Sequence, residues 1–152
     1  MFALLLPILI GLGYVLISSF IPDPHRQRFN ALMVGGAGAA YLSSGAMGPW
    51  ELVFCAAATF VAYRGFDSWT FIGIGWLMHT GWDIVHHLKG HPILPFEPHS
   101  SFGCAICDPV IAIWAFTGGR PLHTELRTWL GRRRTERGSS SGRPLRSGVA
   151  RT

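Results

Sequence analysis

Histidines and carboxylates gather in one short stretch of the chain. Five of the seven histidines, His79, His86, His87, His91 and His99, lie within twenty-one residues, and Asp83 lies among them. Imidazole and carboxylate groups bind divalent metals and transfer protons. This stretch is therefore the first place to look for a functional site.

If this stretch is helical, His79, Asp83 and His86 follow an i, i+4, i+7 spacing and fall within an arc of roughly 60°. His87 lies at the edge of the same stripe. Two imidazoles and a carboxylate on one helix face match what Zn²⁺ or a non-haem iron ion requires. The spacing predicts a metal site formed by these residues. A structural network of hydrogen bonds between helices is the alternative.

Two further carboxyl groups, Glu51 and Asp108, come from other segments. Each is a candidate catalytic residue that acts as general base on a metal-bound water. The expected substrate of such an enzyme is a lipid or another amphiphile. In the alternative reading the protein does no chemistry, and the same site binds or senses a metal ion or a proton.

Cys104 and Cys107 form a C-x-x-C pair directly before Asp108. Such a pair is a redox-active disulfide, a pair of metal thiolates or an inert pair. Membrane proteins that generate disulfides relay electrons through a second cysteine pair, and only Cys55 is left here. The metal site is therefore preferred to the redox reading.

Apolar segments must position these residues. The mean hydropathy is +0.30 and charged residues make up 14% of the chain. Since about 20 apolar residues cross a bilayer, the fold is predicted to be all-α, a polytopic bundle of five transmembrane helices. We expect these helices near residues 2–21, 29–46, 52–63, 69–82 and 102–119. In the second, Gly35 with Ala39 and Gly36 with Ala40 have the spacing of close helix packing.

The basic residues predict an orientation. Nine of the thirteen Lys and Arg residues lie from Arg120 onward. Positive charge stays on the cytoplasmic side, so the N-terminus is expected outside and the C-terminus inside a bacterial plasma (inner) membrane. In this topology Glu51, the histidine stretch and the cysteine pair with Asp108 all meet in the outer leaflet.

Three regions follow from this reading. Residues 1–120 form the transmembrane bundle, 121–131 an interfacial helix, and 132–152 a disordered arginine-rich cytoplasmic tail. The expected partners are the lipid bilayer and, for the tail, anionic lipid headgroups. Nucleic acid is not an expected partner, because the basic residues form a tail after apolar segments and not a patch with interleaved aromatic residues.

Four strings carry a specific resemblance to a known family. They are G-P-W-E-L-V-F (Gly48–Phe54), A-Y-R-G (Ala62–Gly65), F-I-G-I-G-W-L-M-H-T-G-W-D-I-V-H-H (Phe71–His87) and S-S-F-G-C-A-I-C-D-P-V-I-A (Ser100–Ala112). In them the chain resembles small bacterial integral membrane proteins grouped as domain of unknown function 6010, over roughly residues 2–119. The resemblance implies a membrane location and no activity. It points to the side chains already named: Glu51, His79, Asp83, His86, His87, Cys104, Cys107 and Asp108.

Overall fold

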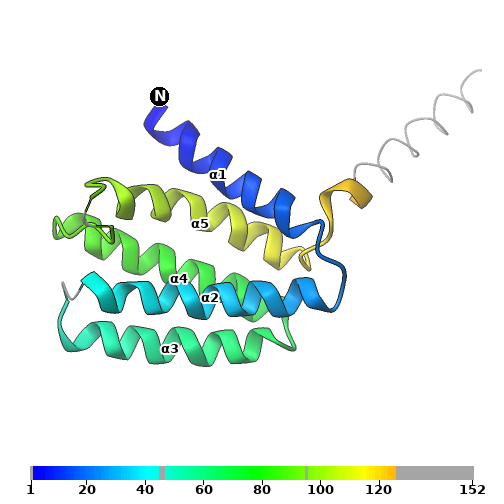
Figure 1. The fold of residues 1–152 in the computed structure, drawn as a ribbon, viewed down its shortest axis with the longest axis horizontal. Coiled ribbons are helices and arrows are strands. Elements are labelled where there is room, and N and C mark those ends of the chain that lie inside the picture. Colours follow the sequence, from blue (N-terminus) through cyan, green and yellow to red (C-terminus); the bar gives the residue numbers. More distant parts are fainter. Residues whose placement is uncertain (1, 45–46, 95, 126–152) are drawn as a thin grey trace, which may run out of the picture. The chain divides into compact units, whose positions relative to one another are not determined.

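The structure is a computed structural model that describes residues 2–44, 47–94 and 96–125. It is all-α, as expected. The helices are α1 (Phe2–Ser18), α2 (His25–Ser44), α3 (Pro49–Gly65), α4 (Trp69–Leu88) and α5 (Ser100–Phe116) (Figure 1). Each observed helix overlaps one predicted segment, and the order along the chain is the predicted one.

The prediction that these helices span a membrane is wrong. None of the helices in the described part of the chain is both long enough and apolar enough to cross one. Helices α1, α3 and α5 have 17 residues each, which at 1.5 Å per residue is about 26 Å, short of a bilayer core of about 30 Å. Helices α2 and α4 have 20 residues, but α2 begins with His25, Arg26 and Arg28, and α4 carries Asp83 between its histidines.

Two further expectations depended on membrane-spanning helices and are corrected with them. These are the polytopic topology with its N-terminus outside and the location in a bacterial plasma membrane. The lipid bilayer as a partner stays a prediction. The error arose because uncharged runs were equated with helices. The first run, residues 2–21, extends beyond α1, which ends at Ser18, where the chain turns.

Successive helices run in opposite directions, and α4 contacts α2, α3 and α5, while α1 packs on α5 (Figure 1). This alternation brings the start of α3, the end of α4 and the start of α5 to one end of the bundle. Glu51, His86 and Cys104 therefore come from three helices to the same region. The sequence predicted that these polar residues lie close together, and they do so although the membrane topology used for that prediction is wrong.

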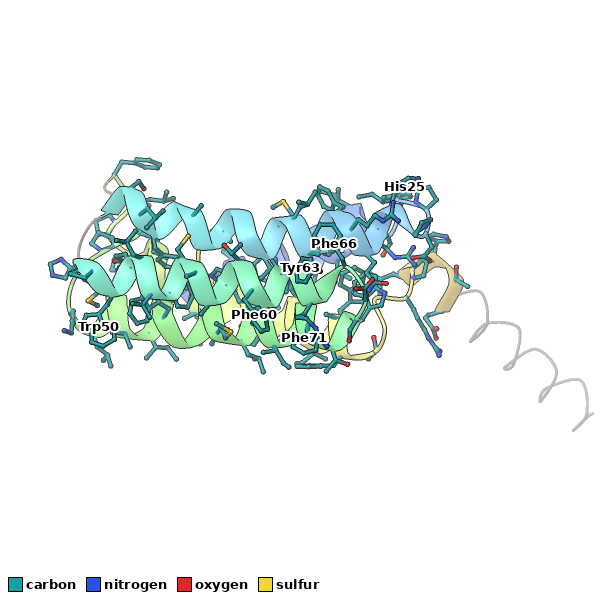
Figure 2. All side chains as sticks on the ribbon, turned by 90° about the horizontal axis from the view of Figure 1, so that it is seen from below. His25, Trp50, Phe60, Tyr63, Phe66 and Phe71 are labelled. Carbon is teal, nitrogen blue, oxygen red and sulfur yellow. The ribbon has the colours of Figure 1, made fainter. Side chains whose placement is uncertain are left out.

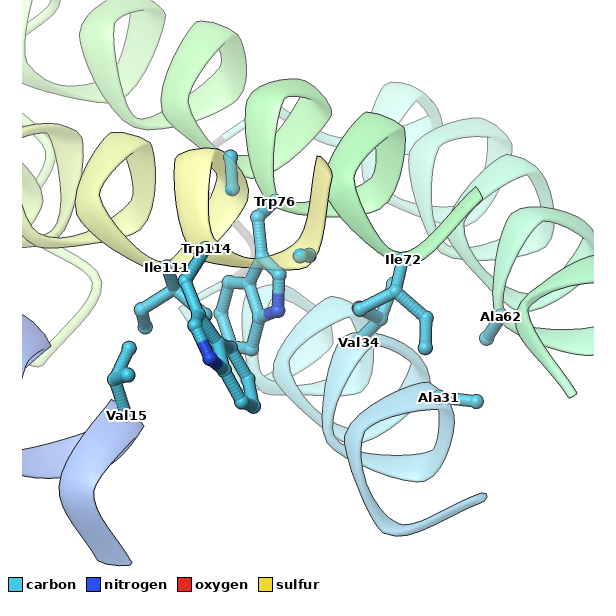
Figure 3. Close-up of a cluster of buried hydrophobic side chains, with 10 residues drawn as sticks. Val15, Ala31, Val34, Ala62, Ile72, Trp76, Ile111 and Trp114 are labelled. Carbon is cyan, nitrogen blue, oxygen red and sulfur yellow. The ribbon is translucent and has the colours of Figure 1, made fainter. Parts of the chain in front are cut away.

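Apolar side chains from all five helices meet in one cluster (Figure 3). Its largest members are Trp76 from α4 and Trp114 from α5, and Ile72 of α4 is fully buried in it. Val15 brings α1 into the cluster and Val34 brings in α2. This cluster holds the end of the bundle away from Glu51 and His86. A smaller cluster that includes Tyr41, Phe54 and Ile93 packs separately from it.

Helix α2 packs closely on α3 through small residues. Gly35 faces Ala62, and Gly38 faces Ala58 so closely that an added Cβ would lie 2.8 Å from the Cβ of Ala58. Side chains at these positions of α2 would push the two helices apart. Because α4 lies against both helices, their spacing also sets the room around His79, whose Cε1 atom would lie 3.7 Å from that same added Cβ.

The predicted packing pairs were only partly right. Gly35 lies at the interface with α3, but Gly36, Ala39 and Ala40 are exposed. The contacting glycines are three residues apart instead of four, which is the other spacing that keeps two residues on one face of a helix.

The chain divides into two compact units, Met1–Pro121 and Leu122–Thr152. In the second unit, residues 122–125 are helical. The rest of the predicted interfacial helix, and the whole predicted tail over 132–152 with its anionic lipid partners, lie outside the described residues.

Replacing Gly38 by alanine should destabilise the protein relative to Gly36→Ala. Both changes add the same methyl group to α2 and remove the same glycine flexibility, but only the Gly38 position meets α3, while Gly36 has open space. We expect the free energy of unfolding of Gly38→Ala to be lower by about 1–3 kcal/mol, the usual cost of overpacking. Denaturant unfolding of the two variants measures the difference, and equal stabilities would show that α2 and α3 are not in close contact.

Candidate functional site

Six buried polar side chains from four helices form the candidate site, called the polar core below. They are Tyr41 from α2, Glu51 from α3, His79, Asp83 and His86 from α4, and Asp108 from α5. The predicted stripe is confirmed in that His79, Asp83 and His86 all face inward. Burying so many polar groups is unfavourable unless each has a partner.

Glu51 and His86 form the outermost pair. The Nε2 atom of His86 lies 3.1 Å from Oε1 of Glu51, at ion-pair distance. Nε2 has no partner in hydrogen-bond geometry. The other carboxylate oxygen of Glu51 accepts a hydrogen bond of 3.0 Å from Nε1 of Trp82, and the backbone N–H of Met47 donates to Oε1.

Local backbone geometry positions the His86 ring. Gly90 has a φ of 70°, the left-handed conformation in which a helix commonly ends. This turn brings the chain back so that the N–H of His91 donates to the carbonyl of His86. The carbonyl of His91 then lies 3.1 Å from Nδ1 of His86 and also accepts a hydrogen bond from Ser101 Oγ of α5.

The His91 carbonyl fixes which nitrogen of the His86 ring donates to it. A carbonyl can only accept, so Nδ1 of His86 carries a hydrogen. Nε2 is then the ring nitrogen that faces Glu51.

Asp83 and Asp108 form the second pair, which joins α4 to α5. Asp83 is fully buried and Asp108 is 6% exposed, and their carboxyl groups are hydrogen-bonded to one another. Two ionised carboxylates offer only acceptors, so this bond needs a proton. Oδ1 of Asp83 accepts a hydrogen bond of 2.6 Å from the Tyr41 hydroxyl. Oδ2 of Asp83 has no geometrically assigned hydrogen-bond partner among the described residues.

Burial favours the protonated form of this pair. It raises the pKa of Asp83 to about 7, against the opposing effect of the hydrogen bonds from Tyr41 and Asp108. Burial, followed by the negative charge of Asp83 and the hydrogen bond to it, raises the pKa of Asp108 to about 8. The pair therefore holds a proton at neutral pH, as expected of two carboxyls that cannot both ionise at close range.

Tyr41 links this pair to His79. Nε2 of His79 lies 2.9 Å from the carbonyl of Val34 and carries a hydrogen, while Nδ1 lies 3.4 Å from the Tyr41 hydroxyl. The two rings stack with centroids 5.6 Å apart. Burial lowers the pKa of His79 despite the Val34 hydrogen bond, so the ring is neutral. Burial and the neighbouring Asp83 raise the pKa of Tyr41, so its hydroxyl keeps the proton that it donates.

The predicted ligands do not surround one point. His87 is exposed, and its ring lies beside Phe102 with centroids 5.2 Å apart. Glu51 contacts His86 and Asp108 contacts Asp83, so these residues form two separate pairs. Among the described residues, no group of three or more His, Cys, Asp or Glu side chains is placed to hold a metal ion. The Zn²⁺ or iron site, and the role of Glu51 or Asp108 as a general base, stay predictions.

Cys104 and Cys107 are free thiols on α5. Burial, with the negative charges of Asp83 and Asp108 as a further cause, raises the pKa of Cys104 to about 12 and that of Cys107 to about 11. Thiols rather than thiolates are therefore present at neutral pH, and thiols are poor nucleophiles and poor metal ligands. The redox role of this pair stays a prediction.

Sequence reasoning missed Tyr41, which connects the two halves of the polar core. Its only signal is a single phenol in an otherwise apolar and small-residue part of α2. Trp82 was also missed as a donor to Glu51, because a tryptophan at the end of an apolar run suggests an interfacial anchor. Both residues depend on contacts between helices that no local pattern specifies.

The arrangement defines an all-α helical protein with a buried polar core of paired acidic and basic side chains. The chain belongs to the family of unknown function DUF6010, whose model matches residues 2–121. This match confirms the resemblance found in the sequence, and by itself it assigns neither an activity nor a membrane location nor a bacterial origin. No curated protein and no solved structure matches the chain.

Replacing Tyr41 by phenylalanine should weaken the polar core in two ways. The Asp83 carboxyl loses a donor, which should lower the free energy of unfolding by about 1–3 kcal/mol. The pKa of Asp83 should rise further, because the Tyr41 hydrogen bond favours its ionised form. Tyr63, which is 68% exposed, supplies the matched control Tyr63→Phe, expected within about 0.5 kcal/mol of wild type. Denaturant unfolding and carboxyl NMR measure the two effects, and equal behaviour of the two variants would remove Tyr41 from the site.

Proposed function

We propose that this protein is a proton-responsive protein, in which the Asp83–Asp108 pair takes up one proton and the loss of that proton changes the packing of α4 on α5. The observation that carries the proposal is the hydrogen bond between two buried carboxyl groups from two different helices. When both groups are ionised, the bond is lost and two negative charges repel across the same interface.

The groups around the pair supply little positive charge. The Tyr41 hydroxyl of α2 donates to Asp83, while the Tyr14 hydroxyl of α1 donates to Asn30. Burial raises the pKa of both phenols, so both keep their protons. His79 of α4 is neutral, since burial lowers its pKa. The nearest groups on α5 are the thiols of Cys104 and Cys107. The other ionisable residues of the polar core, Glu51 and His86, contact each other. A second carboxylate charge at Asp108 is therefore not compensated.

Accessibility favours proton binding over catalysis on a larger substrate. Asp83 is 0% exposed, and a cavity beside α5 is lined by Cys104 and Cys107 but by neither carboxyl group. A proton can reach the pair through small fluctuations of the bundle, whereas a substrate must contact the reacting atoms. The metal-dependent enzyme expected from the sequence uses the same residues, and no contact among the described residues favours it over proton binding.

The proposal predicts aspartate carboxyls that titrate near neutral pH. The chain has four aspartates, so ¹³C-carboxyl labelling of aspartate gives few signals in the full-length protein. We expect two coupled steps, near the pKa values of about 7 and 8. Asp108→Asn should remove the upper step and leave the pKa of Asp83 near 7, because the amide carries no charge and still donates a hydrogen bond to Asp83. Asp67 is exposed, and Asp67→Asn is the matched control that should leave both steps in place.

The same shifts predict how stability depends on pH. A carboxyl whose pKa is raised on folding stabilises the native state fully below its ordinary value of 3.8, and this stabilisation is lost as the pH rises through the folded-state values of about 7 and 8. The free energy of unfolding of the wild type should therefore fall toward pH 8, and the profile of Asp108→Asn should be flatter. A wild-type protein whose aspartates all titrate below about pH 5 would contradict the proposal.

A further inference from the structure

A cavity of about 680 Å³ lies between the N-terminal half of α1, the segment after α4 and the first turns of α5. Helix α1 diverges from α5 toward its N-terminus (Figure 1). The two helices touch closely at Gly11, where an added Cβ would lie 3.0 Å from the carbonyl oxygen of Cys107. Gly103 lies about one turn closer to the α5 N-terminus than Cys107. An added Cβ at Gly103 would be 3.9 Å from the Pro7 side chain of α1. The contact at Gly11 therefore closes one end of a space that widens away from it.

The walls of this space suit an alkyl chain. Leu6, Pro7 and Ile10 line it from α1, and Phe102 and Leu94 line it from the other side. The cavity volume lies within the about 300–1,000 Å³ of ordinary small-molecule sites, which are mostly apolar with a few polar groups that orient the ligand. An apolar chain of modest length would remove these walls from water.

The polar groups at the cavity select the head of such a ligand. His87, Glu97 and His99 are among its lining residues, and no Lys or Arg of the described residues lines it. The Glu97 side chain accepts a hydrogen bond from the backbone N–H of His99. The described lining therefore offers an acidic side chain and no Lys or Arg, which disfavours an anionic head. Imidazole and carboxylate groups together can both donate to and accept from a hydroxyl group.

From this geometry we infer that the α1–α5 cavity binds a single-chain alcohol, with the alkyl chain between Ile10 and Phe102 and the hydroxyl group toward Glu97 and the two histidines. The site is separate from the proton-responsive pair, because neither Asp83 nor Asp108 lines the cavity. The inference therefore does not depend on the proposed function.

Calorimetric titration of the full-length protein with decanol tests this site. We expect saturable binding of one decanol per chain at pH 7, with decanoate binding about tenfold more weakly because its head is anionic. Gly103→Leu fills the cavity from α5 and should weaken decanol binding about tenfold or more. Gly36→Leu adds the same side chain to open space on α2 and should bind as the wild type does.

A further variant keeps the test decisive. Ile10→Trp fills the cavity from α1, so a folding failure of Gly103→Leu leaves a second blocking variant. Decanol binding that is absent, that persists in both blocking variants, or that is no tighter than decanoate binding would overturn the inference.

Discussion

The hydrogen bond between Asp83 and Asp108 joins α4 to α5, and α4 is the helix that contacts α2, α3 and α5. This bond exists only while the pair holds a proton, since two carboxylates offer no donor. Desolvation of a second buried charge would cost several kcal/mol without a compensating cation. The protonation of one carboxyl group is therefore a structural requirement of the helix at the centre of the bundle.

The other polar contacts follow from the same constraint. Each histidine of the polar core uses one ring nitrogen to donate to a backbone carbonyl, that of Val34 for His79 and that of His91 for His86. These bonds orient the rings and leave the second nitrogen to face Tyr41 or Glu51. Close packing at Gly38 makes the hydrogen bond between His79 and Val34 possible, because a side chain at Gly38 would push α2 and α3 apart beside the His79 ring.

Local spacing predicted the parts of the site that one helix determines. The i, i+4, i+7 series fixed the common face of His79, Asp83 and His86, but it could not find Tyr41, whose partners lie on another helix. The membrane prediction failed because apolar residues do not mark an inward face here. On α3 the outward side chains of Trp50, Phe60 and Tyr63 are as apolar as those facing the core (Figure 2), so hydropathy alone could not separate exposed positions from buried ones.

The residue types that suggested a metal site lie in two contacting pairs, Glu51 with His86 and Asp83 with Asp108. Metal-binding histidines also donate one ring N–H to a carbonyl, so the orientation of His79 and His86 does not by itself distinguish the two. The remaining donor atoms do, because Nδ1 of His79 faces a phenol and Nε2 of His86 faces Glu51, while Asp83 is held by Tyr41 and Asp108. A shared ion would require these partners to exchange, whereas a proton is accommodated by the pairs as they stand. These contacts are the reason that we propose proton binding for this polar core.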